Sequence, residues 1–365
     1  MISDREGEMT RATYFYHDSS VYLREQCQSV KLESHSVCAL SLSCPDDVVQ
    51  IALHHQQDYG WAAEHYQAIG LPVSENIVWS NCVPTRQVGM EFSRYACQEK
   101  SVNWSDEIGP LTNSLDEKNV FLQEVEKYGV SVPKTRYYRN IESAELADFP
   151  VVIKLSRMCR GRGVFLVRSP EDVDLIPENR AVQVQAFYTN EISHHLGIAF
   201  SLTGTGVDTL GASDMFFYNK FSWASSRSIT LPDTVNCQLQ PFLHHLWDKG
   251  LRGYLTIDVM VLRNSAFLAH DCNPRVSAST YSWLLSKRLG HIIWEYHKVM
   301  YDSVAALTSA VRTLGYKPDK RFGIIVVNWS YGLSASVDIL FLGTMVEMTR
   351  VKQRVRQSGG RFLSE

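Results

Sequence analysis

The chain of 365 residues carries 36 Lys and Arg against 39 Asp and Glu, which gives a formal net charge of -3. This near balance argues against a nucleic-acid-binding protein, in which a clearly basic domain is typical. No apolar run reaches the roughly 18 residues needed to span a bilayer, and the polar N-terminal stretch is not typical of a secretory signal. The eight cysteines form no CxxC pair, which argues against a zinc site or a disulfide framework. We therefore expect a cytoplasmic protein of two or three domains, with no nucleic-acid or membrane partner.

The N-terminal part predicts a small α/β unit. Residues 1–32 are polar with few periodic apolar positions and predict an irregular lead-in. The apolar run at 37–42 predicts a buried strand, and the Pro-Asp-Asp sequence after it predicts the start of a helix. A second helix ending near Gly70 and a strand at 75–79 repeat this order. Together these elements predict an α/β unit over residues 33–110.

The middle of the chain alternates strand and helix signals. Apolar residues at helical spacing predict a helix from Asp116 to Tyr128, which Gly129 ends. Apolar and β-branched segments predict strands at 150–155, 164–167, 180–187, 194–202, 254–262 and 266–271. A helix is expected at 241–249, with Pro241 in its first turn.

The C-terminal part predicts mainly helix. Residues 281–314 indicate a helix-rich stretch, and 322–327 a last strand. Residues 337–356 predict a terminal helix whose second half is basic, which suits the helix dipole. That basic half is either a solvated face or a contact for an acidic partner.

A lysine at the end of a strand precedes a basic, glycine-bearing loop. Lys154 would project its ammonium from the strand at 150–155, and Gly161 and Gly163 allow backbone N–H groups to approach an anion. Three arginines between 157 and 162 add positive charge. The segment suits a polyphosphate, although it matches neither a Walker A loop nor a dinucleotide-binding turn. The alternative is an ordinary solvated turn.

Two carboxylates face each other on the expected hairpin. If Asn264 and Ser265 form a two-residue turn, Asp258 lies directly opposite Asp271, with Cβ atoms about 5 Å apart. Two carboxylates that close repel each other unless a cation lies between them. Asn273 follows on the same face with an amide oxygen, so the set suits Mg²⁺. The alternative is a surface hairpin with a solvated acid pair.

These segments, in this order over about residues 115–300, resemble the ATP-grasp superfamily of carboxylate–amine ligases. The strand Ile257-Asp258-Val259-Met260 is similar to that of peptide-bond-forming members such as D-alanine–D-alanine ligases. The resemblance implies an α/β (α+β ATP-grasp) fold, in which ATP lies between two subdomains. It divides the chain into an N-terminal pre-ATP-grasp domain, two ATP-grasp subdomains and a C-terminal strand and helix, at residues 1–112, 113–187, 188–320 and 321–365.

The resemblance also assigns the nucleotide-binding residues. Lys118 and Lys154 would contact the ATP phosphates, and Gly161 and Gly163 would let a lid close over them. Lys154 would act in catalysis as well.

A second group would hold the nucleoside. Backbone groups around Gln185 and Phe187 would bind adenine, and Glu191 would bind the ribose hydroxyls. Val184 stands where the family often has a polar or acidic residue, which leaves adenine to the backbone.

The resemblance assigns the metal and catalytic residues to the hairpin. Asp258, Asp271 and Asn273 would hold two Mg²⁺ ions, and Arg275 would stabilise the transferred phosphoryl group. The chain departs from the family at Asp271, where glutamate is more common.

The implied activity is that of an ADP-forming carbon–nitrogen ligase. ATP would activate a carboxylate as an acyl phosphate, and an amine would displace the phosphate to form an amide or peptide bond. The partners would be a small-molecule carboxylate and an amine, natural-product biosynthesis is the expected context, and a homodimer is the expected assembly. The alternatives are an ATP-binding regulatory protein without turnover and an ATP-grasp kinase.

Two further segments leave their roles open. The aromatic stretch 214–223, with Lys220 and Arg227, would either line a substrate pocket or pack between strands. His194 and His195 have no third ligand at a useful spacing, so a core or surface role is expected for them rather than metal binding.

Overall fold

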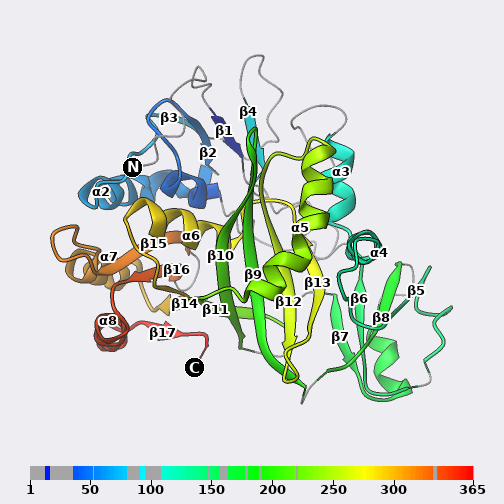
Figure 1. Ribbon diagram of the computed structural model, residues 1–365. Helices are drawn as coiled ribbons and strands as arrows, with labels where there is room; N and C mark the ends of the chain where they lie inside the picture. The colour runs from blue at the N-terminus through cyan, green and yellow to red at the C-terminus, as the bar shows by residue number, and fades with distance from the viewer. Residues whose placement is uncertain are drawn as a thin grey trace.

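The computed structural model describes residues 13–16, 36–51, 53–79, 91–94, 108–146, 148–156, 163–176, 180–188, 191–218, 221–331 and 335–364. Within these ranges the strands form three sheets, with helices packed on their faces (Figure 1). This architecture confirms the expected α/β class. None of the described helices is long and apolar enough to cross a membrane.

The N-terminal elements form a small parallel sheet with helical turns around it. The order of its described strands is β3-β2-β1-β4, and every neighbouring pair runs parallel. The elements are β1 (Thr13–Tyr16), η1 (Ser36–Ser41), β2 (Val48–Ile51), η2 (Leu53–Asp58), α2 (Tyr59–Ala68), β3 (Asn76–Trp79) and β4 (Glu91–Arg94). The helix expected to end near Gly70 and the strand after it are confirmed by α2 and β3.

Three predictions for this region are wrong. The polar lead-in contains strand β1, and 37–42 falls in the 3-10 helix η1 rather than in a strand. The hydroxyl of Ser41 donates to the carbonyl of Cys38 at 2.7 Å, and such a bond favours a helical turn. The helix expected next is strand β2, because the Asp47 carboxylate accepts from the amide of Cys44 at 2.7 Å and closes a turn instead of capping a helix.

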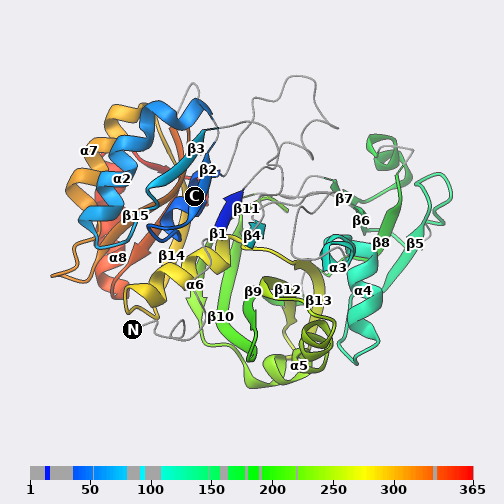
Figure 2. The same ribbon diagram turned by 90° about the horizontal axis from the view of Figure 1, so that it is seen from above.

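A large antiparallel sheet forms the centre of the molecule. Its described strands run in the order β13-β12-β9-β10-β11-β14-β16-β15, with β17 paired to β14. The strands are β9 (Ile192–Thr203), β10 (Gly206–Phe217), β11 (Trp223–Ile229), β12 (Gly253–Leu262), β13 (Phe267–Asn273), β14 (Trp294–Tyr301), β15 (Gly323–Tyr331), β16 (Ala335–Leu342) and β17 (Arg361–Phe362). The helices that accompany them are α5 (Asp233–Asp248), α6 (Ala278–Arg288), α7 (Val304–Leu314) and α8 (Met345–Gln357). Figure 2 shows α5 lying along the outer face of this sheet.

Two segments that the sequence predicts to be helical form strands β14 and β16 instead. Within 281–314, β14 separates α6 from α7, and only the second half of 337–356 is helical, as α8. β16 lies between β14 and β15 and is buried on both faces from Val337 to Leu342. A strand buried on both faces lacks polar alternation, so its sequence resembles that of a buried helix.

Helix α5 begins earlier than its sequence predicts. It starts at Asp233, so Pro241 lies inside the helix and not in its first turn. The apolar side chains of Leu239, Phe242 and Leu243 are fully buried. Burial of this face offsets the backbone hydrogen bond that the proline removes.

A smaller antiparallel sheet carries the lysine strand. The described strands run in the order β5-β8-β6-β7, and the lysine strand and its partner lie where the sequence predicts them. The elements are α3 (Ile108–Leu115), α4 (Lys118–Glu126), β5 (Thr135–Tyr138), β6 (Val151–Leu155), β7 (Val164–Val167), η3 (Pro170–Leu175) and β8 (Val182–Ala186). Figure 1 shows this sheet beside the β12–β13 hairpin, with α4 next to both.

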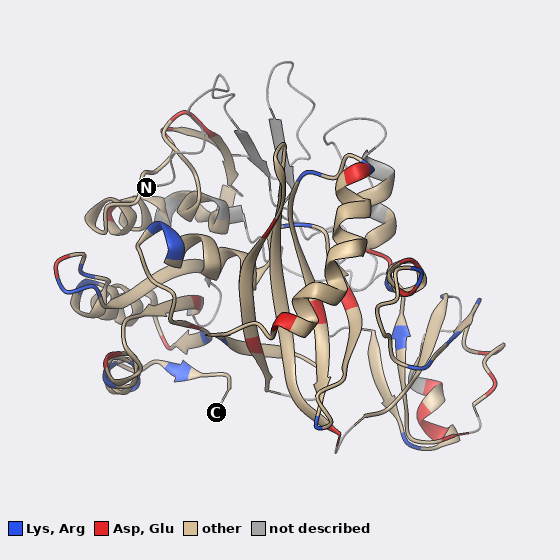
Figure 3. Ribbon diagram, viewed as in Figure 1, with Lys and Arg blue, Asp and Glu red and all other residues tan. Residues whose placement is uncertain are grey.

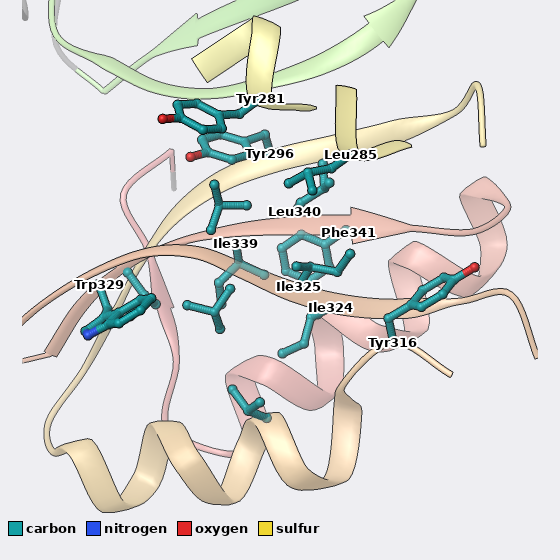
Figure 4. Packing of buried hydrophobic residues seen from close by; sticks show 14 of the residues in the cluster. Tyr281, Leu285, Tyr296, Tyr316, Ile324, Ile325, Trp329, Ile339, Leu340 and Phe341 are labelled. Atoms are coloured by element: carbon teal, nitrogen blue, oxygen red, sulfur yellow. The ribbon is translucent and has the colours of Figure 1, made fainter. Parts of the chain in front are cut away.

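The described residues bury three hydrophobic cores. The largest joins the N-terminal elements to β14, β15 and β16, and Figure 4 shows its centre, where the paired residues Tyr296, Leu340 and Ile325 lie on three neighbouring strands. The Tyr66 hydroxyl donates to the carbonyl of Val326 at 2.7 Å and fixes α2 on this core. A second core lies under α4 and α5 on β9 and β12, and a third fills the smaller sheet. The proposed domain boundaries stay a prediction.

Candidate functional site

Lys154 lies on the face of β6 that points away from the core of the smaller sheet. Its neighbours Ile153 and Leu155 pack into that core, so alternation along the strand places Lys154 on the opposite face. The residue is only 9% exposed. Burial lowers the pKa of its ammonium to about 8, and the carboxylate of Asp271 opposes this shift. Lys154 is therefore a buried cation near acidic groups of another sheet.

The predicted pair of facing carboxylates is confirmed, although the turn differs from the prediction. Asp258 pairs with Asp271 across β12 and β13. The turn is one residue longer than expected, because the amide of Leu262 donates to the carbonyl of Ala266 at 2.7 Å. Ser265 in this turn has a φ of 66°, which suits a three-residue hairpin loop.

A β-bulge restores the register that the longer turn would shift. Val259 pairs with Ala269, but the next pair is Asp258 with Asp271, so His270 is the extra residue on β13. A bulge re-aims the side chains beside it. The carboxylates therefore meet through two compensating irregularities, a longer turn and a bulge.

The two carboxylates are electrostatically different. Burial and then the charge of Asp271 raise the pKa of Asp258, Lys118 and Arg275 oppose them, and the net value is about 7. Asp271 receives hydrogen bonds from Lys118 Nζ to both of its oxygens, at 2.9 and 2.7 Å. Among the residues that the structure describes, Asp258 accepts one weak bond, from Asn273 Nδ2 at 3.3 Å. Asp258 is thus the carboxylate that would gain more from an added cation.

Lys118 joins three elements at the site. It is the first residue of α4, and its backbone amide donates to the carbonyl of Ser156 at 3.1 Å, directly after the lysine strand. Its side chain reaches Asp271 on β13. The helix start, β6 and β13 are therefore fixed around one buried ammonium.

Arg275 and Asn273 extend the group beyond β13. The Arg275 guanidinium donates to Asn273 Oδ1 at 2.7 Å, and its amide donates to the carbonyl of the same residue at 2.8 Å. Figure 3 shows acidic segments on the β12–β13 hairpin. Three cationic residues and two carboxylates thus meet where the hairpin, α4 and the smaller sheet adjoin.

The remaining predicted residues lie around this group in different ways. Gly163 adopts a φ of 67° just before β7, and Gly161 lies outside the described residues. Gln185 is buried on β8, and its Nε2 donates to Thr135 Oγ1 at 3.2 Å. Phe187 follows that strand and is partly buried. Glu191 is exposed and its carbonyl accepts from the amide of Arg263 in the hairpin turn; roles for these residues stay a prediction.

The aromatic stretch forms parts of two strands. At its start, Asp214 Oδ2 accepts from the Arg227 guanidinium at 3.1 Å, and His194 Nδ1 lies 3.3 Å from the other oxygen of that carboxylate. Lys220 lies outside the described residues. Asp214 therefore already binds Arg227, which was one candidate for a substrate carboxylate.

Three further residues lie near Lys154, and sequence reasoning assigns none of them a role at the phosphate site. Gln183 lies directly opposite it on β8. His195 and His270 come from β9 and β13, and their ring centroids lie 6.3 Å apart. Burial lowers the pKa of both imidazoles, and the Lys154 charge contributes in each case. The bulge that re-aims His270 has no clear signal in the sequence.

Comparisons with known proteins support the fold. No protein-family model matches the sequence, and no curated protein matches it. The structure is similar to N5-carboxyaminoimidazole synthetase from Staphylococcus aureus complexed with ADP, with a TM-score of 0.60, 8% identity, and coverage of 95% of this chain and 96% of that chain. It is also similar to a biotin carboxylase ATP-analogue complex from Campylobacter jejuni, with a TM-score of 0.58, 11% identity, and coverage of 97% and 93%.

A third similar structure is the biotin carboxylase domain of the Hydrogenobacter thermophilus 2-oxoglutarate carboxylase. Its TM-score is 0.58 at 9% identity, and the match covers 96% of this chain and 90% of that chain. Identities this low show the fold alone. The chain therefore has the fold of the ATP-grasp superfamily, as the sequence resemblance implies.

Proposed function

We propose that the protein is an ATP-dependent carboxylate–amine ligase. The observation that carries the proposal is the meeting of Lys118, Lys154 and Arg275 with the facing pair Asp258 and Asp271. Separate elements supply these residues within an ATP-grasp fold. A cluster of cations and carboxylates at such a junction suits a polyphosphate with its metal ion.

The cationic residues would bind the phosphates of ATP. Lys154 is buried, and no described residue accepts a hydrogen bond from its Nζ, so an anionic oxygen would supply the missing partner. Lys118 is paired with Asp271 and would share its protons between that carboxylate and a phosphate. Arg275 would contribute two donors in a fixed geometry to the transferred group.

The side chains of the hairpin are of the chemical type that binds Mg²⁺. The carboxylates of Asp258 and Asp271 and the amide oxygen of Asn273 are hard oxygen donors of the kind Mg²⁺ binds. No three His, Cys, Asp or Glu side chains gather as a metal site in the described part of the chain. The nucleotide phosphates would therefore complete the coordination, which is usual for Mg²⁺. When bound, the ion would neutralise charge on the phosphates.

The proposed reaction has two steps. A carboxylate oxygen attacks the terminal phosphorus of ATP, the bond to ADP breaks, and an acyl phosphate forms. An amine then attacks the acyl carbon, inorganic phosphate leaves, and an amide remains. Lys154 and Arg275 would stabilise the charge that develops on the phosphoryl oxygens. Exclusion of water would protect the acyl phosphate from hydrolysis.

The proposed substrates are small molecules, a carboxylate and an amine. The titles of the similar structures name a carboxyaminoimidazole synthetase and biotin carboxylases, one of them with bicarbonate bound. Bicarbonate is therefore a carboxylate to test beside amino acids. An amide or peptide product remains our preferred proposal because the hairpin strand resembles that of peptide-forming ligases.

The test measures phosphate release from Mg-ATP with pools of carboxylates and amines, and identifies products by mass spectrometry. The proposal predicts ADP and phosphate only when both substrates are present, and a product lighter than their sum by one water. A phosphorylated product that accumulates would support a kinase instead. Binding of ATP without turnover in any pool would support a nucleotide-binding regulatory protein. The variant Asp258→Asn is the matched negative control.

A further inference from the structure

Four large apolar side chains lie exposed together at one end of the central sheet. Ile292 and Ile293 precede β14 and are 76% and 42% exposed, and Met345 and Val346 begin α8 and are 49% and 60% exposed. β14 pairs with β16, and one segment leads into β14 while the other follows β16, so the two lie side by side. Single exposed apolar residues are common, but a group of them indicates a contact surface. We call these four residues the apolar patch.

Hydrogen bonds fix the backbone that carries the apolar patch. Arg321, in the turn before β15, donates to the carbonyl of Gly290 at 2.7 Å. Glu347 Oε2 accepts from the amide and the hydroxyl of Thr344, both at 2.8 Å, at the start of α8. Burial lowers the pKa of His291, Arg321 lowers it further and Glu347 raises it, so both charged residues lie near this imidazole. The patch is therefore formed before any partner binds.

The exposed charges beside the apolar patch are mainly positive. Val346, Arg350 and Arg354 follow one another at intervals of four along α8 and are all exposed, so they share one outward face of the helix. Figure 3 shows further blue segments at the end of α6 and in the turn before β15. Their exposed cations are Lys287, Lys317, Lys320 and Arg321. Within residues 287–290, 316–322 and 343–354 the acidic residues are Asp319 and Glu347, whereas the whole chain has a net charge of -3.

These charges favour an acidic partner over the other possible occupants of the surface. A two-fold contact between copies of the chain would bring the same cations against one another, which is unfavourable. An anionic lipid surface would match the cations but gains little from a fixed backbone, whereas a shape-specific protein contact does gain from one.

We propose that the apolar patch and the cations beside it form a docking surface for an acidic protein segment that carries large apolar side chains. The apolar side chains of the partner would pack on Ile292 and Val346. Its carboxylates would meet Arg350, Arg354 and the cations of the turn before β15. This surface does not depend on the proposed function.

Helix α6 connects the docking surface to the candidate site. Its 11 residues span about 16 Å, and its last turn leads to the apolar patch. Near its start, Ser279 lies beside Asp258, because a Cβ added at Gly197 would lie 2.9 Å from Ser279 Oγ and 3.4 Å from Asp258 Oδ1. A docked partner would therefore lie about one helix length from the carboxylate pair.

The test measures the binding of two labelled synthetic peptides by fluorescence anisotropy at low salt. Both are amphipathic helices with the same leucine face, and the polar face is glutamate in one and lysine in the other. The wild type should bind the glutamate peptide about tenfold or more tightly than the lysine peptide. Val346→Ser should weaken binding of the glutamate peptide about tenfold. Arg350→Glu should weaken it by a similar factor and reduce its dependence on salt.

The matched control is Leu53→Ser, since Leu53 is 49% exposed on η2, outside the patch, and this variant should bind as the wild type does. All three substitutions change exposed side chains, so the melting temperatures should match that of the wild type. Failure of the wild type to bind the glutamate peptide, equal binding of the two peptides, or unchanged binding by Val346→Ser would overturn the proposal.

Two further outcomes would assign the surface to another occupant and would also overturn the proposal. Analytical ultracentrifugation would favour a second copy if the wild type self-associates and Val346→Ser does not. Sedimentation with vesicles of phosphatidylserine and phosphatidylcholine in equal parts, without binding of the glutamate peptide, would favour a membrane surface.

Discussion

Replacing Asp258 with asparagine should stabilise the unliganded protein while it abolishes turnover. Burial and the neighbouring Asp271 raise the pKa of Asp258 from 3.8 to about 7. Between these values the folded state binds more protons than the unfolded state, so the free energy of unfolding falls as the pH rises through this window. An asparagine side chain does not titrate and avoids this loss.

The magnitude follows from the size of the shift. A shift of about three units corresponds to roughly 4 kcal/mol between the protonation states. The variant side chain keeps an oxygen that can accept from Asn273 Nδ2. We therefore expect Asp258→Asn to be more stable than the wild type by about 2–4 kcal/mol near pH 8, and by almost nothing near pH 4.

The assay is denaturant unfolding of both proteins across this pH range, with a chelator present to remove metal ions. Asp319→Asn is the control, because Asp319 is an exposed residue of a turn, and its replacement should change stability little at any pH. A wild type as stable as Asp258→Asn near pH 8 would refute the reasoning that burial and Asp271 make the ionised form of Asp258 unfavourable in the folded state. Loss of stability in the variant would refute it more strongly.

The remaining predictions concern binding and packing. Lys154→Met should weaken Mg-ATP binding about tenfold or more, because it removes a charge-assisted bond, without lowering the unliganded melting temperature; calorimetry checks this, and the exposed Lys320→Met should bind normally. Gly211→Ala should destabilise the fold by roughly 3 kcal/mol or more, because Gly211 has a φ of 151° and an added Cβ would lie 2.3 Å from the ring of Trp283. Gly204→Ala, with no atom within 4 Å of the added Cβ, should cost far less in the same unfolding experiment.

The sequence predicts the elements that carry the cationic and acidic residues. Lys154 follows a β-branched run, which is a strong strand signal, and Asp258 and Asp271 flank a short turn signal. The prediction that these two carboxylates face each other is confirmed, although the predicted two-residue turn is wrong. The bulge at His270 offsets the extra residue of the longer loop. Such compensation depends on tertiary packing and leaves no local pattern.

Other features depend on contacts between distant segments. β16 carries no polar alternation because both of its faces are buried, so its helix-like sequence is misleading. Gln183 belongs to an ordinary strand, and its place opposite Lys154 becomes evident only when β6 and β8 are paired. The meeting of His195 with His270 likewise requires the antiparallel order of β9, β12 and β13.

The most direct test of the central claim follows oxygen from a carboxylate into phosphate. The protein is incubated with Mg-ATP, an amine pool, and amino acids and other carboxylates labelled with ¹⁸O in the carboxyl group, and bicarbonate is tested separately. Activation as an acyl phosphate predicts that the released phosphate carries one ¹⁸O atom, since the amine displaces the phosphate by cleaving the bond between carbon and oxygen. Phosphate that is released without the label would show hydrolysis of ATP by water and would contradict the account.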